Sequence, residues 1–363
     1  MYQLEFKNIC KTFDHKSISA LNSVNLVLSS DPLAIMGPSG TGKSTLLKIM
    51  SGLVKPDSGE VYLNEGQGAK RITFEELKKW VSYLPQALEI SNEKTIFEHI
   101  QAACAPENDD SYYYTRELID LFSLHYKDDQ YPNQLSFGQL QRLAFAIALA
   151  SRPKWILLDE PFAHLDLMLE KELKIELAQV FEQLGVTPVL VTHAFKDVLD
   201  NSSKLYLLHY GQIYQSGDPL DLYLQPKDSF VARFFGPSNL IPVSIVLEDA
   251  GRAQVFSESL EENLDFGASV YPMTYNQSAA SEFAFAFFRP EALDLLPENE
   301  SEVGIKAKVQ KVSIGENGNL VEVSLLSKNN QIKLYAYDRF RQIRKGQKVR
   351  MQVRLDQVRI ISS

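Results

Sequence analysis

Cysteine is scarce in this chain of 363 residues, and its two cysteines, Cys10 and Cys104, lie far apart. Their separation matches no zinc-ligand spacing, and two isolated thiols favour a reducing compartment over a disulfide framework. The chain also lacks an apolar run of the roughly 20 residues that a helix needs to cross a bilayer. The segment 1–6 lacks the basic and then apolar pattern of a signal peptide. We therefore expect a cytoplasmic protein, and any membrane span that it serves must belong to another chain.

Positive charge is also in short supply. The 37 Lys and Arg residues are outnumbered by 46 Asp and Glu residues, which gives a formal net charge of -9. This balance argues against overall binding to nucleic acid or to an anionic membrane surface. A hydrophobic fraction of 45% and a charged fraction of 23% are those of a globular protein, and the length allows two or three domains.

A glycine-rich loop is the most informative stretch. An apolar segment at 33–36 predicts a buried strand before it, and a helical pattern that ends near Gly52 follows it. The loop fits the phosphate-binding pattern G-x-x-x-x-G-K-[ST]. It consists of Gly37, Pro38, Ser39, Gly40, Thr41, Gly42, Lys43, Ser44 and Thr45. We expect its amide groups and the helix N-terminus to bind phosphates, with Lys43 at the β- and γ-phosphates and Ser44 as a ligand of Mg²⁺.

Two carboxylates follow a second apolar run. Asp159 and Glu160 come directly after the segment 155–158, so they should lie at the carboxyl edge of a parallel sheet. Taken alone, they equally fit an ordinary strand end. Beside a phosphate-binding loop, we expect Asp159 to hold Mg²⁺ and Glu160 to polarise the water that attacks the γ-phosphate.

Two further polar residues also follow predicted strands. His193 comes after the apolar segment 189–191, where it could contact the γ-phosphate, although a lone histidine is more often structural. Gln86 follows the predicted strand at 80–84 and could ligate Mg²⁺ or the attacking water. Beside the phosphate-binding loop, Glu160, His193 and Lys43 are the candidate catalytic residues, and Ser44, Gln86 and Asp159 are the candidate metal ligands.

The hydrophobic pattern changes once along the chain. Short apolar strands alternate with helices up to the segment 234–237, which predicts a parallel α/β sheet covered on both faces. Beyond it the period becomes two, with turns at 315–318 and 327–330, which predicts a small antiparallel β unit of the oligonucleotide/oligosaccharide-binding barrel type. We expect two domains, at 1–236 and 237–363.

The segment from Leu135 to Arg142 settles which phosphate-loop protein this is. Leu135-Ser136-Phe137-Gly138-Gln139 resembles the LSGGQ signature of ATP-binding cassette (ABC) ATPases, although Phe137 replaces its first glycine. The order of the loop, Gln86, this signature, the carboxylate pair and His193 is also that of the family. The resemblance covers about residues 2–235. It implies a P-loop NTPase cassette with a helical subdomain.

The resemblance also implies a mechanism. Two such cassettes pair head to tail, and each ATP lies between one subunit's phosphate loop and the other's signature. Ser136, Phe137, Gly138 and Gln139 would therefore bind ATP in trans.

Two more residues match positions of known role in the family. Phe13 matches the aromatic residue that stacks on adenine, with an ordinary core phenylalanine as the alternative. Asp166 matches the loop that couples the two sites across the dimer.

The C-terminal unit resembles the accessory β domain of importer ATPases for sulfate, molybdate, iron, polyamines and sugars, in particular at Phe287–Leu293. Its charge is divided: residues 237–302 hold two basic and twelve acidic residues, whereas residues 303–363 hold thirteen basic and four acidic. The basic part could bind an oxyanion or nucleic acid, or it could be a solvated face or pack on the acidic part. The strand residues concerned are Lys306, Lys308, Lys348, Arg350 and Arg354.

These observations predict the ATP-hydrolysing subunit of an ABC importer. The expected cofactor is Mg²⁺, with ATP as substrate. The expected partners are a second copy of the chain, two integral-membrane permease subunits and, indirectly, a solute-binding protein, with no nucleic acid. The expected location is the inner face of the cell membrane. The alternative is a soluble ABC-type ATPase that acts on ribosomes or DNA, which usually carries two cassettes or a long coiled coil in one chain.

Overall fold

The computed structural model describes residues 2–13, 19–66, 68–104, 110–163, 165–249, 252–257, 262–266, 284–298, 305–314, 318–325, 333–338 and 342–362. The chain forms two compact units, which divide between Pro219 and Leu220. This division precedes the predicted boundary at 236/237, because Arg289, far along the chain, donates hydrogen bonds to carbonyls in the short helices α7 (Pro219–Leu224) and α8 (Ser229–Phe234).

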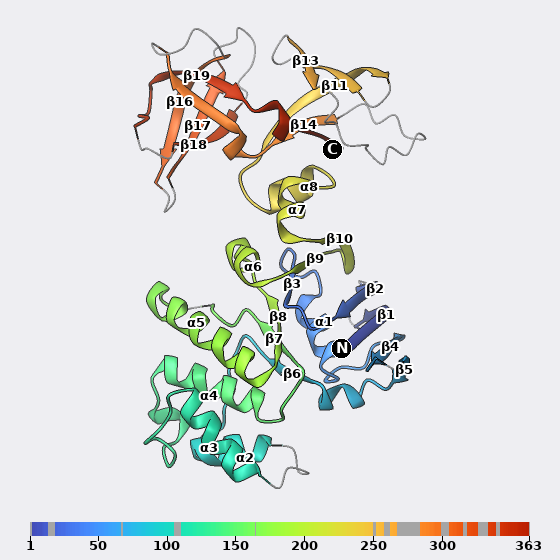
Figure 1. Cartoon of the computed structure of the whole chain (residues 1–363), viewed down its shortest axis with the longest axis vertical. Helices are drawn as coiled ribbons and strands as arrows, with labels where there is room; N and C mark the ends of the chain where they lie inside the picture. Colours follow the sequence, from blue (N-terminus) through green and yellow to red (C-terminus); the bar gives the residue numbers. More distant parts are fainter. Residues whose placement is uncertain are drawn as a thin grey trace. The chain divides into compact units, whose positions relative to one another are not determined.

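The first unit contains two sheets (Figure 1). In the smaller one all neighbours are antiparallel, in the order β2 (Ser19–Leu28), β1 (Gln3–Thr12), β4 (Ser58–Asn64) and β5 (Ala69–Ile72). The larger one has the order β10 (Gln212–Gly217), β9 (Lys204–His209), β3 (Leu33–Met36), β8 (Thr187–Val191), β7 (Trp155–Asp159) and β6 (Val81–Leu84). All of its neighbours are parallel except β10 and β9. The predicted parallel sheet is therefore confirmed.

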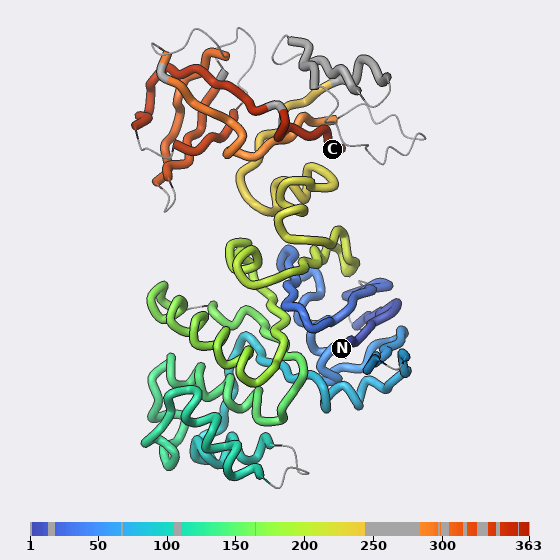
Figure 2. Tube along the Cα trace, in the orientation of Figure 1, coloured from blue at the N-terminus to red at the C-terminus, as the bar shows by residue number. Residues whose placement is uncertain are grey.

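Six α-helices accompany these sheets among the described residues of the first unit. They are α1 (Lys43–Met50), α2 (Ile96–Ala103), α3 (Ser111–Leu121), α4 (Phe137–Leu149), α5 (Leu167–Leu184) and α6 (Phe195–Asn201), with 3-10 turns at Glu76–Lys79 and Pro132–Gln134. Figure 2 shows the chain leaving the sheet region for α2, α3 and α4, which form a layer of their own, before it returns through β7. This layer is the helical subdomain that the resemblance implies.

The strand β7 shows why the sheet is covered on both sides. Trp155 and Leu157 pack in a core that also contains side chains of β1, β2 and α1, whereas Ile156 and Leu158 pack in a second core with α2, α3, α4 and α5. Successive side chains of a strand point to opposite faces, so a continuous apolar run indicates burial on both. The apolar run at 155–158 therefore indicates that β7 is a central strand, and the polar residues Asp159 and Glu160 follow at its end.

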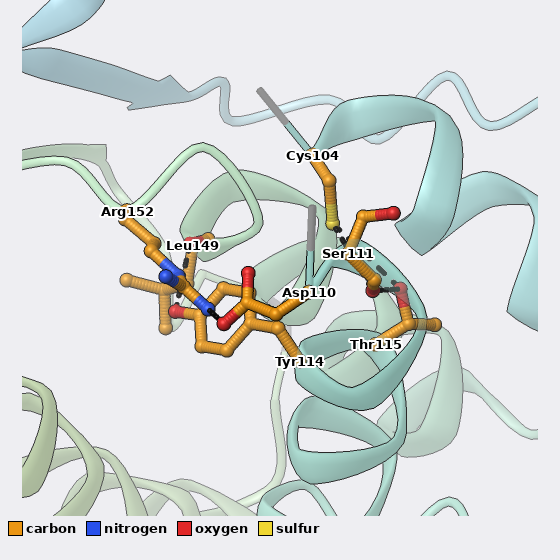
Figure 3. A network of polar contacts seen from close by, with 7 residues as sticks. All are labelled: Cys104, Asp110, Ser111, Tyr114, Thr115, Leu149 and Arg152. Atoms are coloured by element: carbon orange, nitrogen blue, oxygen red, sulfur yellow. Dashed lines mark hydrogen bonds and ion pairs between the residues drawn. The ribbon is translucent and has the colours of Figure 1, made fainter. Parts of the chain in front are cut away.

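A polar network fastens the helical layer (Figure 3). The Tyr114 hydroxyl on α3 donates a hydrogen bond to the Leu149 carbonyl at the end of α4, at 3.3 Å, and the Arg152 guanidinium lies 4.0 Å from the Tyr114 ring. Arg152 also pairs with Asp110 at 2.6 Å. The Cys104 thiol is free, buried and 3.7 Å from the Thr115 hydroxyl. These contacts hold α3 against the C-terminal end of α4.

The parallel strands place several loop starts at one edge. Leu84 of β6 lies opposite Leu158 of β7, and Asp159 lies opposite Val191 of β8. Gln86 and Glu160 lie two residues past the paired residues Leu84 and Leu158, so the same register places them side by side and next to the segment before His193. Since β3 pairs with β8, the phosphate-binding loop begins at the same edge.

The second unit is antiparallel, as predicted. One sheet has the order β13 (Glu262–Phe266), β12 (Arg252–Ser257), β11 (Asn239–Asp249), β14 (Ala284–Phe288) and β20 (Arg359–Ser362). The other has the order β15 (Leu293–Pro297), β19 (Lys348–Val353), β16 (Ile305–Ser313), β17 (Asn319–Leu325) and β18 (Lys333–Asp338), with 3-10 turns at Pro290–Ala292 and Leu355–Gln357. Its edge strands β15 and β18 contact each other, so this sheet curls toward a barrel.

Side-chain contacts in the second unit answer part of the question about its charges. Arg354 forms a two-point ion pair with Asp294 of β15, at 2.7 and 3.0 Å. At this position the basic part of the unit therefore packs on the acidic part.

The Arg289 side chain is buried, at 3% exposure. Its guanidinium donates hydrogen bonds to the carbonyls of Tyr223 and Ala232, and burial lowers its pKa to about 10. Among the described residues of the whole chain, no helix is long and apolar enough to span a membrane.

Candidate functional site

The glycine-rich loop connects the buried strand β3 to α1, as predicted. The Lys43 ammonium is 7% exposed and donates hydrogen bonds to the carbonyls of Gly37 and Pro38, at 2.8 and 3.0 Å. The Thr41 hydroxyl donates to the same Pro38 carbonyl at 2.9 Å. Burial lowers the pKa of the Lys43 ammonium, and the nearby charges of Glu160 and then Asp159 oppose that shift. The loop therefore curls around a buried cation that lies close to both carboxylates.

Gly42 is the residue that permits this curl. Its φ is 99°, a left-handed conformation that side chains rarely adopt, and it caps the N-terminus of α1. A Cβ atom at this position would lie 2.3 Å from the Ala20 carbonyl oxygen. The amide groups of the first turn of α1, which includes Ser44 and Thr45, lie just beyond it. Such a helix start favours an anion, because its free amides and its dipole both point outward.

Two predicted residues contact the carboxylate of a third, Glu160. The Gln86 amide donates to Glu160 Oε2 at 2.9 Å, and His193 Nε2 lies 2.9 Å from Glu160 Oε1. Glu160 has a φ of 51°, unusual for a residue other than glycine, and its amide donates to the Val191 carbonyl at 2.9 Å. This strained turn at the end of β7 aims the side chain between the two neighbouring strand ends. Both carboxylate oxygens thus have a fixed partner.

Asp159 lies deeper than Glu160, with 5% exposure at the last position of β7. The Tyr83 hydroxyl on β6 donates a hydrogen bond to its Oδ2 atom at 3.1 Å. Burial, and next the charge of Asp159, raises the pKa of the Tyr83 hydroxyl, so that it keeps its proton and remains a donor. Tyr83 is not among the site residues predicted from the sequence. Its position three residues before Gln86, on the strand beside β7, was the available signal.

The oxygen groups predicted for Mg²⁺ suit this ion chemically. Ser44, Asp159 and Gln86 offer a hydroxyl, a carboxylate and an amide oxygen, which are hard ligands. This composition fits Mg²⁺, which usually keeps several waters and binds through one or two protein groups together with substrate phosphates.

A cavity of about 790 Å³ adjoins the loop. Phe13, which is 49% exposed, lines it together with Ser39 and Gly40 of the phosphate-binding loop, and Tyr210 of the β9–β10 turn lines it as well. The Lys11 ammonium lies 5.6 Å from the centroid of the Phe13 ring. An exposed ring beside a phosphate-binding loop is the arrangement that base stacking requires. The alternative of an ordinary core phenylalanine does not fit this exposure.

The signature residues form the start of α4. Ser136 caps the helix, since its hydroxyl accepts from the Gln139 amide while the Gln139 side chain accepts from the Ser136 amide. Phe137 is 53% exposed. A Cβ atom on Gly138 would lie 3.2 Å from the Leu169 side chain in the first turn of α5. The helix start is therefore ordered, and it lies against the start of α5.

Asp166 caps the neighbouring helix α5. One of its carboxylate oxygens accepts from the amides of Met168 and Leu169, both at 3.0 Å. The starts of α4 and α5 thus lie side by side, with Ser136 and Asp166 as their caps. The structure brings Lys43, Asp159, Glu160, Gln86 and His193 together in one place, and it places the signature and Asp166 on these two helix starts.

Comparison with known proteins agrees with this geometry. Residues 21–163 match the protein family described as ABC transporter. The chain is 38% identical to the sulfate/thiosulfate import ATP-binding protein CysA of Bradyrhizobium diazoefficiens, over 67% of this chain and 71% of the relative. It is 32% identical to the protein of the same name from Nitrosomonas europaea, over 90% and 87%. It is 34% identical to the spermidine/putrescine import ATP-binding protein PotA of Clostridium novyi, over 74% and 79%.

Solved structures of similar fold are also ABC cassettes. One is the dimeric post-hydrolysis structure of the ATP-binding cassette MJ0796 bound to ADP and Pi, with a TM-score of 0.51 and 30% identity over 60% of this chain and 98% of that chain. Another is a nucleotide-free ATP-binding cassette from an ABC transporter, with a TM-score of 0.55 and 25% identity over 65% and 99%. The chain therefore belongs to the ABC transporter family, as an ATP-hydrolysing subunit of the importer type.

Proposed function

We propose that the cluster around Glu160 is the hydrolytic centre of this subunit. The observation that carries the proposal is that Gln86 and His193 each hold one oxygen of Glu160, close to the buried Lys43. Phosphoryl transfer requires mainly positioning and neutralisation of charge. Lys43 and the loop amides bind the β- and γ-phosphates, Glu160 accepts a hydrogen bond from the attacking water, and His193 contacts the γ-phosphate.

We assign Mg²⁺ to Ser44 and Asp159, with Gln86 as a further oxygen ligand. When bound, the ion neutralises charge on the phosphates and orients them. Asp159 is buried and lies close enough to Lys43 for its charge to act on the ammonium group. The proposed phosphate site therefore lies beside both a cation and an anion. The exposed ring of Phe13 stacks on the adenine at the mouth of the adjoining cavity.

The metal assignment predicts the effect of Asp159→Asn. We expect this variant to lose Mg²⁺-dependent phosphate release by about 100-fold, because removing the carboxylate weakens metal binding and charge neutralisation. Asp294→Asn is the matched control, since it neutralises a carboxylate of the second unit that pairs with Arg354. Phosphate release should be measured across a Mg²⁺ titration. A wild-type Mg²⁺ response in Asp159→Asn would contradict the assignment.

We propose that the ATP-binding site of one copy is completed by the adjacent starts of α4 and α5 of a second copy. Ser136, Phe137, Gly138 and Gln139 of a second copy face the γ-phosphate, and Asp166 couples the two sites. Because Asp166 also caps α5, the useful variant is Asp166→Asn, which keeps an acceptor for the cap but removes the charge. We expect unchanged thermal stability with a lower Hill coefficient for ATP. An unchanged Hill coefficient would remove the coupling role.

We further propose how the subunit works with other chains. Residues 1–236 act as the nucleotide-binding domain, at the inner face of the cell membrane, on two integral-membrane permease subunits that receive solute from a binding protein. The related proteins are named for importing anions and polycations, so their names leave the solute of this chain open. Recovery of the chain in the membrane fraction only when its permease subunits are co-expressed would support this placement, and recovery independent of them would contradict it.

We assign an accessory role to residues 237–363, as a dimer contact and a regulatory module. The curled five-stranded sheet and the division of charge between residues 237–302 and 303–363 support this role. Calorimetric titration of the full chain with sulfate, molybdate, iron and polyamines tests the regulatory part, and the absence of heat with all four would count against it.

A further inference from the structure

Two side-chain hydrogen bonds connect the end of β6 to the carboxylate pair at the end of β7. On β6 and the loop that follows it, Tyr83 bonds to Asp159 at 3.1 Å and Gln86 bonds to Glu160 at 2.9 Å. The parallel register explains both contacts, because Leu84 lies opposite Leu158. One strand end therefore holds both carboxylates of its neighbour. The Gln86 contact belongs to the centre already described, whereas the Tyr83 contact has no assigned role.

We propose that Tyr83 is a positioning residue for the metal site: its hydrogen bond to Oδ2 orients the Asp159 carboxylate and leaves Oδ1 as the oxygen that would be available to Mg²⁺. This inference rests on the proposed assignment of Mg²⁺ to Asp159. The terminal torsion of an aspartate is broad, so an unrestrained carboxylate rotates over a wide range. A hydrogen bond to one oxygen narrows that range and leaves the other oxygen available. Tyr83 thus acts on the metal site through the Asp159 carboxylate.

Two features favour this role over simple packing. Asp159 is 5% exposed, so solvent cannot readily replace the Tyr83 hydroxyl as a partner for Oδ2. The hydroxyl also points across the strand to the one carboxylate that the sequence pattern assigns to the metal, rather than to a backbone group. Outer-shell partners of metal ligands commonly change metal affinity by about 10- to 100-fold when they are removed.

The test uses Tyr83→Phe in the full chain, which removes one oxygen and keeps the ring. Affinity for a non-hydrolysable ATP analogue, AMP-PNP, is measured by calorimetry with Mg²⁺ and with EDTA, and the ratio of the two gives the metal-dependent part. We expect Tyr83→Phe to lower this ratio about fivefold and to leave the affinity in EDTA unchanged. Melting temperature verifies that the variant folds.

Tyr62→Phe provides a matched control. Tyr62 lies on β4 of the same unit, and its hydroxyl also donates to a carboxylate, that of Glu60, at 2.6 Å. We expect Tyr62→Phe to keep the wild-type ratio. A wild-type ratio in Tyr83→Phe, or an equal loss in both variants, would overturn the inference.

A double-mutant cycle separates this inference from the metal assignment itself. If Tyr83 acts through Asp159, Tyr83→Phe should not lower the ratio further in the Asp159→Asn background. If Tyr83→Phe lowers the ratio by the same factor in the Asp159→Asn background as in the wild type, the positioning role is overturned and the metal assignment is unaffected. A wild-type ratio in Asp159→Asn alone would instead contradict the metal assignment on which the inference rests.

Discussion

Replacing Glu160 with glutamine should abolish ATP turnover and leave ATP bound in a stable dimer. Glutamine keeps the size of the side chain and can retain a contact to His193 or Gln86, but it cannot act as a base toward water. General-base groups contribute about 100- to 10,000-fold to rate, so steady-state phosphate release should fall by that factor. Loss of the negative charge also removes repulsion against the γ-phosphate, which favours retention of ATP.

Two measurements on this variant are informative together. Phosphate release reports turnover, and size-exclusion chromatography with ATP reports the dimer. Glu60→Gln is the control, because Glu60 lies on β4 and pairs with Arg71, away from the loop. Unchanged hydrolysis in Glu160→Gln would remove Glu160 from its role. Lost hydrolysis without ATP-dependent dimers would keep that role and contradict the sandwiched site.

Replacing Lys43 with alanine should strongly weaken the binding of ATP. The ammonium is buried among the loop carbonyls and close to two carboxylates, so its removal deprives the phosphates of the nearest cation. Hydrogen bonds to charged groups are worth about 1.5–3 kcal/mol each, which corresponds to a loss of about 10- to 150-fold in affinity.

Lys48→Ala is the control for this experiment, because Lys48 is an exposed residue in the last turn of the same helix. Both affinities should be measured by calorimetry with ATP and Mg²⁺. Wild-type affinity in Lys43→Ala would refute the assignment of the glycine-rich loop. A similar loss in both variants would indicate that α1 as a whole had been disturbed.

The grouping of Gln86, Glu160 and His193 was predictable from sequence because each follows a buried parallel strand. Strands of one parallel sheet end at one edge. The short apolar runs that alternate with helical segments are therefore enough to place these residues together. Side-chain partners depend on register and rotamer, which the pattern does not encode. The bond from Tyr83 to Asp159 and the buried contacts of Arg289 are of this kind.

The boundary between the two units illustrates a second limit. The segment 234–237 has the composition of a linker, yet α8 and all of α7 beyond Pro219 belong to the second unit, because Arg289, far along the chain, donates hydrogen bonds to the carbonyls of Tyr223 and Ala232. Local composition cannot reveal such a long-range contact. Ser136 and Asp166 show the converse: the sequence predicts functional roles for both residues, and in the structure both also cap helices.

The central claim is that each ATP site is built from two copies of the chain. Mixing Lys43→Ala with Gly138→Asp tests it directly, because each variant alone has no complete site. In a mixed dimer, the intact phosphate-binding loop of the Gly138→Asp subunit meets the intact signature of the Lys43→Ala subunit. ATP hydrolysis by the mixture, absent from either variant alone, is the predicted result. A mixture that forms dimers but stays at the background of its components would contradict the account.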